Sequence, residues 1–180
     1  MKTVLVLFAA GSEELEAITI VNILRRAGIT VTLAGLAAGP LRGSRSVMLV
    51  PDCTLDAVLQ DDFDMVVLPG GQPGTDKLRA DARIAELVRR MARQERFVAA
   101  ICAAPAVLAS AGLLDGRQAT GFPGALDQFP RVMQQHAAVV EDGRFITSRG
   151  PGTAMDFALA LAEKLAGSAR RQEVEAGLQR

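Results

Sequence analysis

The chain has 180 residues, 49% of them hydrophobic, and no linker-like stretch divides it, so we expect a single domain over residues 1–180 with one sizeable core. Its 20 basic and 20 acidic residues balance to a net charge of zero, and no cluster of Lys and Arg is interleaved with aromatic residues. This composition argues against specific nucleic-acid binding and against an anionic membrane as the main partner.

Short β-rich runs alternate with longer helical patterns along the chain. The first strand is predicted at Val4–Phe8, because this apolar run, although long enough for a minimal signal peptide, leads at once into a capped helix. Further strands are predicted at Thr30–Ala34, Met65–Leu68, Phe97–Ile101 and Phe145–Ser148, and helices near 13–27, 76–94, 104–112 and 154–166. Near-continuous apolar strands separated by helices indicate a doubly wound α/β fold, with a mainly parallel sheet and helices on both faces.

The C-terminal part adds two features. A small β-hairpin is predicted where Val139–Val140 and Phe145–Thr147 flank the Gly-containing turn 141–144. The charged tail after Gly167 is expected to fray or to form one last short helix. No apolar run in the chain reaches the roughly 20 residues that span a bilayer, so we expect no membrane segment.

An open α/β sheet binds its ligand at the junctions that follow the strands. After the first strand, the segment A-A-G-S-E-E-L-E-A-I offers Ser12 as a helix N-cap, and Glu13 and Glu14 as first-turn carboxylates that the helix dipole favours. Glu16 differs, because it shares the apolar stripe of the helix with Ile20, Ile23 and Ala27. Either its carboxyl is buried, with a raised pKa and a retained proton, or it lies at the end of the stripe and reaches water.

The stretch L-P-G-G-Q-P-G directly follows the strand Met65–Leu68. The adjacent Gly70 and Gly71 would allow backbone N–H groups to approach a ligand closely or to form an anion-binding nest. The stretch lacks the Lys-Ser/Thr of a phosphate-binding loop and the G-x-G-x-x-G of a dinucleotide site. A purely structural turn would need the same glycines, so both interpretations stay open.

The segment A-I-C-A-A-P places Cys102 between the strand Phe97–Ile101 and a helix that Pro105 suits as a first-turn residue. A nucleophile elbow occupies such a position, and the small alanines around it would let the turn pack tightly. The helix dipole and its free N–H groups are expected to lower the pKa of the thiol from about 8.5. The alternative is that Cys102 is a buried and inert residue, as free cysteines often are.

The other polar candidates carry weaker signals. In I-T-S-R-G-P-G-T, Thr153 is a candidate N-cap, and Arg149 is either an anion clamp or, as the sequence favours, a surface ion-pair partner. The single histidine, His136, precedes the hairpin; it is interpreted as a surface residue, with a Cys–His dyad between distant parts of the sequence as the alternative. Cys53 lacks an elbow and is interpreted as structural. Two cysteines are too few for a disulfide framework, and no Cys/His cluster has zinc-ligand spacing, so we expect a cytoplasmic protein and no metal.

Five stretches together resemble the ThiJ/PfpI superfamily, and within it the DJ-one and YajL-like branch. They are G-S-E-E-L-E at 11–16, R-R-A-G-I at 25–29, V-V-L-P-G-G at 66–71, A-A-I-C-A-A-P at 99–105 and T-S-R-G-P-G-T at 147–153. They follow the family's order and cover nearly the whole chain. The resemblance implies a flavodoxin-like homodimer without a cofactor, in which Cys102 matches the reactive cysteine and Glu16 matches its protonated partner.

The resemblance also implies the rest of the site. The backbone N–H groups of Gly71 and Ala103 match those that hold an oxyanion or an oxidised sulfur, and Arg45 matches an arginine that approaches across a dimer contact along the first helix. Two positions depart from related patterns. Ala103 stands where superfamily proteases carry a His after the cysteine, so no protease triad is expected. Phe122 stands where the animal branch carries a pocket His.

The activity implied by the resemblance is that of a glyoxalase or deglycase, which acts on small reactive carbonyls such as methylglyoxal, or on their adducts with protein and nucleotide groups, and protects against carbonyl and oxidative stress. Cys102 would attack the carbonyl, the backbone N–H groups would stabilise the oxyanion, and Glu16 would act as general acid and base. The alternative is a redox-sensing chaperone whose cysteine is oxidised to a sulfinate that neutral Glu16 would hydrogen-bond.

Overall fold

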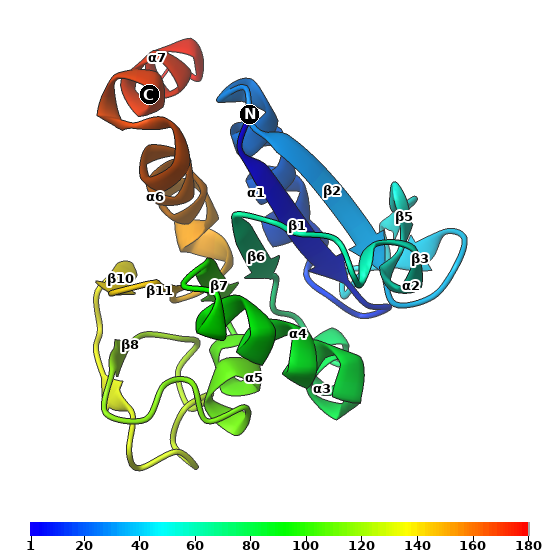
Figure 1. Ribbon diagram of the computed structural model, residues 1–180, viewed down its shortest axis with the longest axis vertical. Helices are drawn as coiled ribbons and strands as arrows, with labels where there is room; N and C mark the ends of the chain where they lie inside the picture. The colour runs from blue at the N-terminus through cyan, green and yellow to red at the C-terminus, as the bar shows by residue number, and fades with distance from the viewer. Residues whose placement is uncertain (180) are drawn as a thin grey trace.

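A seven-stranded sheet forms the centre of the molecule (Figure 1). In the computed structural model, which describes residues 1–179, the strand order is β10-β11-β7-β6-β1-β2-β5. All neighbouring strands are parallel except β10 and β11. The strands are β1 (Thr3–Phe8), β2 (Thr30–Gly35), β5 (Cys53–Thr54), β6 (Met65–Leu68), β7 (Phe97–Ile101), β10 (Val139–Asp142) and β11 (Phe145–Ser148).

The central strands are buried on both faces because the sequence supplies uninterrupted apolar runs. All residues of β6, and all but the first of β1 and β7, are buried. Parallel strands covered on both sides need such runs, since neither face meets water. The five strands predicted from the sequence are confirmed to within one residue at each end.

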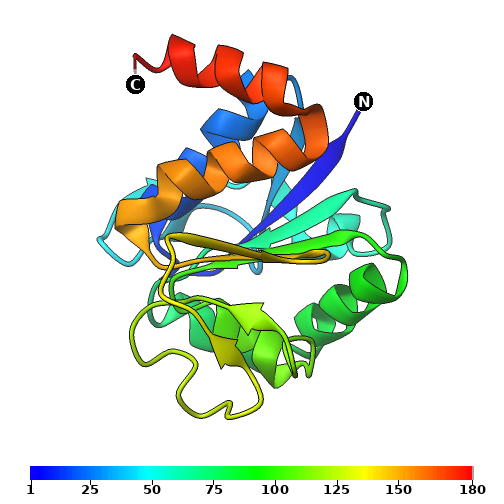
Figure 2. The same cartoon turned by 90° about the vertical axis from the view of Figure 1, so that its left-hand side faces the viewer.

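Helices cover both faces of the sheet, which confirms the predicted doubly wound architecture (Figure 2). On one face, α1 (Glu14–Arg26) packs against α6 (Ala154–Ala166), and α7 (Ser168–Gly177) follows α6. The opposite face carries the cluster that α2 (Leu55–Val58), α3 (Gly74–Ala80), α4 (Ala82–Arg93) and α5 (Pro105–Ser110) bury against the sheet. The two apolar layers hold the carboxyl ends of β1, β6 and β7 side by side.

The single helix predicted over 76–94 is in fact two helices, α3 and α4. They meet at Asp81, whose backbone is extended and whose carboxylate accepts a hydrogen bond from the backbone N–H of Arg83 at 2.9 Å. An aspartate that caps the following helix in this way competes with continuation of the preceding one. The apolar periodicity of the two helices merges across the break, which is why the prediction joined them.

The charged tail forms the ordered helix α7 rather than fraying. Arg170 donates hydrogen bonds to the carbonyl oxygens of Arg26 and Ala27 at 2.9 and 3.2 Å, and Val174 is buried. The last carbonyls of a helix have no partner within the helix, so Arg170 satisfies groups at the end of α1. Helix α7 is therefore fastened to the first helix of the chain.

Several short elements lie outside the predicted ones. The strands β3 (Leu41–Arg42) and β4 (Met48–Leu49) form an antiparallel pair, and β8 (Gln118–Ala119) and β9 (Met133–Gln134) a parallel one; a 3-10 turn, η1 (Pro151–Thr153), precedes α6. Two residues are too few to give a periodic signal. The predicted hairpin is confirmed as β10 and β11, with Val139 opposite Ser148 and Asp142 opposite Phe145.

The two predicted serine and threonine N-caps make other hydrogen bonds. The Ser12 hydroxyl accepts from the backbone N–H of Ala9 at 3.2 Å, and α1 begins at Glu14 with no side-chain cap. Thr153 immediately precedes α6, but its hydroxyl contacts Gly150 and lies 2.7 Å from the Ser148 hydroxyl. Both side chains stabilise the turns before their helices instead of the first helical N–H groups.

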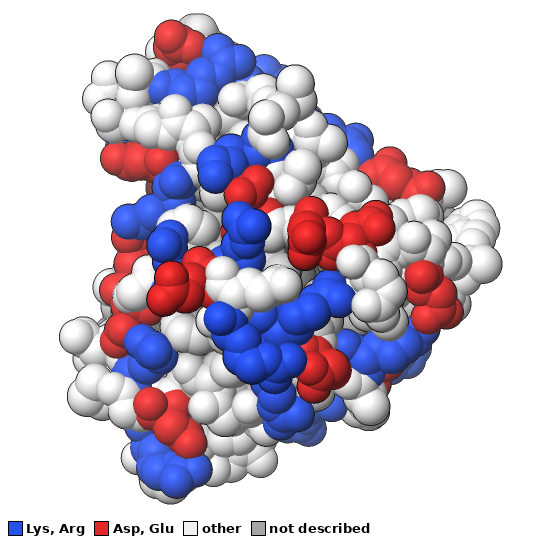
Figure 3. All heavy atoms as spheres, in the orientation of Figure 1, with Lys and Arg blue, Asp and Glu red and all other residues white. Residues whose placement is uncertain are grey.

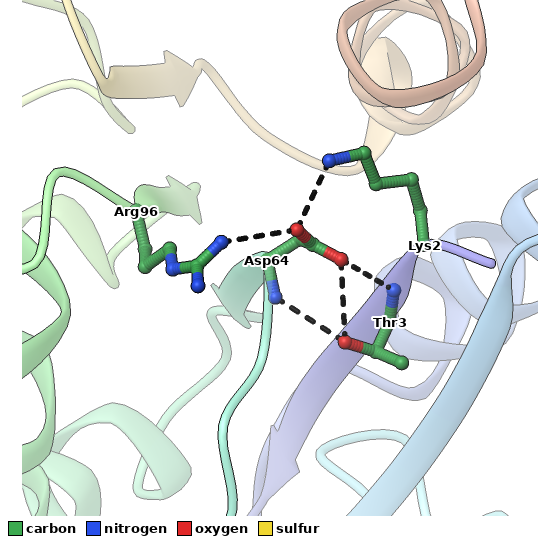
Figure 4. Close-up of polar contacts among 4 residues, drawn as sticks. All are labelled: Lys2, Thr3, Asp64 and Arg96. Carbon is green, nitrogen blue, oxygen red and sulfur yellow. Dashed lines mark hydrogen bonds and ion pairs between the residues drawn. The ribbon is translucent and has the colours of Figure 1, made fainter.

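Asp64 links three strands at the amino end of the sheet (Figure 4). Its Oδ2 accepts from the backbone N–H of Thr3 at 3.0 Å, and its Oδ1 lies 3.1 Å from Lys2 Nζ and 3.2 Å from Arg96 Nη1. Burial raises the pKa of Asp64, but the hydrogen bonds from Thr3 and Lys2 and the nearby positive charges lower it overall. The ionised carboxylate therefore ties β1, β6 and β7 together at the end opposite their carboxyl termini.

Charges of both signs are mixed over the face shown in Figure 3, with Lys and Arg gathered near α4. Arginines of this helix are engaged in ion pairs: Arg83 with Asp56 and Asp81, and Arg93 with Glu86. Within residues 1–179, none of the helices has the length and apolar character needed to cross a bilayer.

Candidate functional site

Cys102 lies on a sharp turn at the carboxyl end of β7, as predicted for a nucleophile elbow. Its φ of +64° is in the left-handed region, which costs a non-glycine residue about 1–2 kcal/mol. Its backbone N–H bonds to the carbonyl of Ser148 in β11 at 3.0 Å, and Pro105 begins α5. Hydrogen bonding to the neighbouring strand holds the strained turn in place.

The adjacent glycines after β6 are required by close packing against this turn. A Cβ on Gly70 would lie 2.6 Å from the Cβ of Cys102 and 2.9 Å from the nitrogen of Ala103. Gly71 has a φ of +85°, and a Cβ there would collide with the backbone nitrogen of Glu13. Only glycine lets this backbone lie so close to the cysteine.

Glu16 is fully buried, which decides between the two interpretations of its position on the helical stripe. Its Oε2 accepts a hydrogen bond from the backbone N–H of Gly70 at 2.7 Å. Burial raises the pKa of Glu16 to about 7; the Gly70 and Cys102 hydrogen bonds act against this rise, and the Glu13 charge adds to it. The Gly70 N–H is thus used by Glu16, and the role of Gly70 in substrate binding stays a prediction.

The prediction of a lowered thiol pKa is wrong. Burial, followed by the negative charge of Glu16, raises the pKa of Cys102 to about 12, although the backbone N–H groups of Gly71 and Ala103 hydrogen-bond to the sulfur and oppose the rise. The helix that was expected to lower it, α5, is only six residues long. A short helix presents a small dipole, which a nearby carboxylate and desolvation outweigh.

Glu16 and Cys102 therefore titrate as a pair. Once the first proton leaves near pH 7, the second must leave a site that already carries a negative charge, and repulsion between the charges raises its pKa. Between these two values the pair holds one proton and one negative charge. Because Glu16 has the lower pKa of the two, the remaining proton lies mainly on the sulfur, and a thiolate forms when the Glu16 carboxylate takes that proton. Glu16 can therefore act as the base that activates Cys102, a role that the helix does not fill.

Cys102 is buried, with 8% of its surface exposed, and it lines a cavity of about 240 Å³. Arg45 lines the same cavity from the loop between β3 and β4 of the same chain. Its approach to the site across a dimer contact stays a prediction. The lining residues are Glu13, Ser44, Arg45, Gly71, Gln72, Cys102, Ala103, Phe122 and Pro151.

Glu13 and Glu14 hold the loop that carries Arg45, a role that the helix-dipole argument missed. Glu14 is 4% exposed and accepts from the backbone N–H groups of Arg45 at 2.9 Å and Val47 at 3.2 Å, and Glu13 accepts from the Ser44 hydroxyl at 2.6 Å. Burial raises the pKa of Glu14, but its hydrogen bonds with backbone N–H groups lower it overall. The sequence places Glu13 and Glu14 at the start of an apolar helix but does not indicate that they bind a loop about 30 residues further along the chain.

Comparison with known proteins identifies the relatives of this fold and site. Residues 2–164, which include all of the site residues above, match the DJ-1/PfpI family. The chain belongs to the DJ-1/PfpI family. The Drosophila melanogaster protein dj-1beta is 44% identical over 183 residues, which cover 98% of this chain and 96% of the fly protein.

The crystal structure of that fly protein superposes on this DJ-1/PfpI chain with a TM-score of 0.96, covering 99% of this chain and 97% of the fly one. The glutathione-independent glyoxalase DJR-1.2 of Caenorhabditis elegans is 35% identical over 158 residues, covering 87% of this chain and 84% of the worm protein. The resemblance inferred from the sequence motifs is thereby confirmed, and with it the flavodoxin-like fold.

Three candidates from the sequence lie outside the cavity of this DJ-1/PfpI chain. Arg149 is exposed and donates to the carbonyl of His136 at 3.4 Å, and His136 is itself exposed, as predicted. Cys53 is half-buried in the edge strand β5. No group of three or more His, Cys, Asp or Glu within residues 1–179 is arranged to hold a metal ion.

Proposed function

We propose that this chain is a cysteine-dependent enzyme of the glyoxalase or deglycase type, which acts without a cofactor on small reactive carbonyls or on their adducts with protein and nucleotide groups. The observation that carries the proposal is that Cys102 lines the cavity beside the proton-exchanging Glu16. A family member, DJR-1.2, is a glutathione-independent glyoxalase. Protection against carbonyl and oxidative stress in the cytoplasm is the role that such an activity would serve.

The first chemical step is addition of the sulfur to an aldehyde. The bond between Sγ and the aldehyde carbon forms while the electrons of the C=O double bond move to the oxygen, and the thiol proton passes to the Glu16 carboxylate. The backbone N–H groups of Gly71 and Ala103 point toward the sulfur and are placed to stabilise the oxygen as it becomes negative. The negative charge thus moves from the residue pair onto the substrate.

For a dicarbonyl, the next steps are an internal oxidation and reduction. Glu16 first gives its proton to the negative oxygen, and its carboxylate then takes the hydrogen of the former aldehyde carbon as a proton. The second carbonyl oxygen takes up the proton of the new hydroxyl group, and Glu16 returns its proton to the neighbouring carbon as the first carbon regains its C=O double bond. The first carbon becomes a thioester and the second carries a hydroxyl group, so no external electron acceptor is required. Water then hydrolyses the thioester, which releases a 2-hydroxy acid and restores the thiol; methylglyoxal would give lactate.

Lactate release from methylglyoxal tests this mechanism. Cys102→Ser is expected to lower kcat/KM by at least about 100-fold, and Glu16→Ala by about 100-fold, because each removes one partner of the nucleophile and base pair. Cys53→Ser is the matched control, since it removes the other thiol from an edge strand. Undiminished turnover by the Cys102 variant would remove the proposed chemistry.

We also propose that the chain forms a homodimer along α1. Exposed apolar side chains gather on this helix and on the segment around β4, namely Leu15, Ile18, Val47, Met48 and Val50, and Val50 is 72% exposed. Apolar side chains clustered in this way mark protein interfaces. Sedimentation should give a dimer for the wild type and a monomer for Ile18→Glu; a wild-type monomer at micromolar concentration would contradict the proposal.

A redox-sensing chaperone is a second candidate function, because the groups that would bind a carbonyl oxygen also fit an oxidised sulfur. A sulfinate on Cys102 would accept hydrogen bonds from the Gly71 and Ala103 N–H groups and from protonated Glu16. Mild peroxide treatment followed by intact-mass measurement separates the two functions. Two added oxygens on Cys102, together with a gain in aggregation suppression, support the sensor; loss of carbonyl turnover alone supports the enzyme.

A further inference from the structure

Phe122 is an exposed aromatic residue at the mouth of the Cys102 cavity. Its side chain is 52% exposed, and it is the only aromatic one among the exposed large hydrophobic residues of the described chain. A single exposed apolar residue on a protein surface needs no special explanation. Phe122 differs from such a residue because it is fixed beside the reactive sulfur.

Two contacts fix its position. The backbone N–H of Phe122 donates to the carbonyl oxygen of Cys102 at 2.7 Å, so the segment is anchored to the turn that carries the nucleophile. At Gly150, a Cβ would lie 3.4 Å from the Cδ2 of the Phe122 ring and 4.0 Å from the Sγ of Cys102. The ring edge and the sulfur therefore border the same small space.

The cavity also has polar lining residues. These are Glu13, Ser44, Arg45 and Gln72, whereas the Phe122 ring supplies an apolar surface. A substrate held in such a cavity can place its oxygens toward the polar residues and a hydrocarbon group against the ring. Glyoxal, which consists of two aldehyde groups, has no group to place there.

The size of the cavity limits what that group can be. Its volume of about 240 Å³ is equivalent to about eight water molecules and lies below the roughly 300 Å³ at which sites for drug-sized ligands begin. A dicarbonyl with a short or branched alkyl group fits such a volume. Burial of that group against the ring is favourable because it removes apolar surface from water.

We infer that Phe122 makes this site selective for α-oxoaldehydes that carry a short alkyl group over glyoxal. The inference rests on the proposed function and specifies its substrate class. Phe122 is a specificity residue that contacts the substituent and takes no part in proton transfer.

The test is the ratio of kcat/KM for isopropylglyoxal to kcat/KM for glyoxal. We expect the wild type to favour isopropylglyoxal by about tenfold, because contact with one apolar wall is worth about as much as one or two methylene groups in a pocket. Phe122→Gln, which replaces the ring by a polar chain, is expected to abolish that preference, and Phe122→Leu to keep most of it. Met133→Ala is the control, since Met133 is similarly exposed at 48% and lies outside the cavity.

Three results would overturn the inference: a wild type without the preference, a Phe122→Gln variant that keeps it, or an equal fall of both rates in that variant, which would indicate a structural role only. Each of these leaves Cys102-dependent turnover of glyoxal intact as evidence for the proposed function. Failure of the proposed function would give a different result, because Cys102→Ser would then turn over glyoxal at the wild-type rate.

Discussion

Replacement of Glu16 by Gln tests whether the buried carboxyl holds its proton near neutral pH. Glutamine has nearly the same shape, and its side-chain oxygen can still accept the hydrogen bond from the Gly70 N–H. It cannot ionise. The comparison between Glu16→Gln and the wild type therefore isolates the free energy of burying the charge.

The magnitude follows from the pKa of Glu16, which is about 7 in the fold against an ordinary value of 4.5. Between these values the folded chain binds more protons than the unfolded chain, so the free energy of unfolding falls as pH rises from about 4.5 to about 7. The whole difference corresponds to about 3 kcal/mol. Because part of it is already lost at pH 5, about 2–3 kcal/mol is expected to be lost between pH 5 and pH 8.

Urea unfolding at pH 5 and pH 8, at one protein concentration, measures this loss. Glu16→Gln should gain about 2–3 kcal/mol relative to the wild type between the two pH values, which for a chain of this length is a relative rise in Tm of about 5–10 °C. Glu86→Gln is the control. A hydrogen bond from Arg93 holds the pKa of Glu86 below its ordinary value, so removing this charge cannot produce a gain at pH 8.

A constant difference between Glu16→Gln and the wild type at both pH values would refute the reasoning. It would mean that the buried carboxyl is ionised at pH 5 as well. Glu16 would then have no proton to exchange with Cys102, and the paired titration on which the mechanism depends would not exist.

Three further changes give distinct expected outcomes. Gly71→Ala should lower the free energy of unfolding by about 2–4 kcal/mol, measured in urea, because its φ is left-handed and its Cβ meets the nitrogen of Glu13. Glu14→Gln should raise KM for methylglyoxal by about threefold to tenfold with a smaller effect on kcat, because it loosens the loop that presents Arg45; an equal change in both constants would count against this positioning role. Arg170→Ala should cost about 1 kcal/mol and speed amide exchange across 168–177, since it frees α7 from the end of α1. Unchanged amide exchange across 168–177 would show that burial of apolar side chains is enough to hold α7 in place without Arg170.

The parts of the fold that could be predicted are those with long apolar patterns. Uninterrupted apolar runs predict the strands β1, β6 and β7, which are buried in the structure. The elbow at Cys102 follows from a strand that leads directly into a helix beginning with proline. The break at Asp81 was missed because a single capping side chain overrides periodicity without changing it. Repeated sequence patterns can be recognised in the sequence, whereas a structural feature that depends on one hydrogen bond cannot.

The same limit applies to the candidate site. The position of Glu16 on the apolar stripe of its helix left two interpretations open, and burial was one of them. The proximity of Gly71 to Cys102 could be predicted, because the neighbouring strands β6 and β7 end side by side. The raised pKa of Cys102 could not be inferred, because it depends on how closely a carboxylate approaches in three dimensions. The position of Arg45 in the cavity could not be inferred either, because it depends on a hairpin whose strands are only two residues long.

That hairpin gives the site two separate mechanical supports. The sulfur rests on the central sheet, whereas Arg45 belongs to the short pair β3 and β4, which lies outside that sheet and is fastened to α1 mainly through Glu14. A substitution in the hairpin can therefore alter one part of the cavity lining while the strained turn keeps its own hydrogen bond to β11.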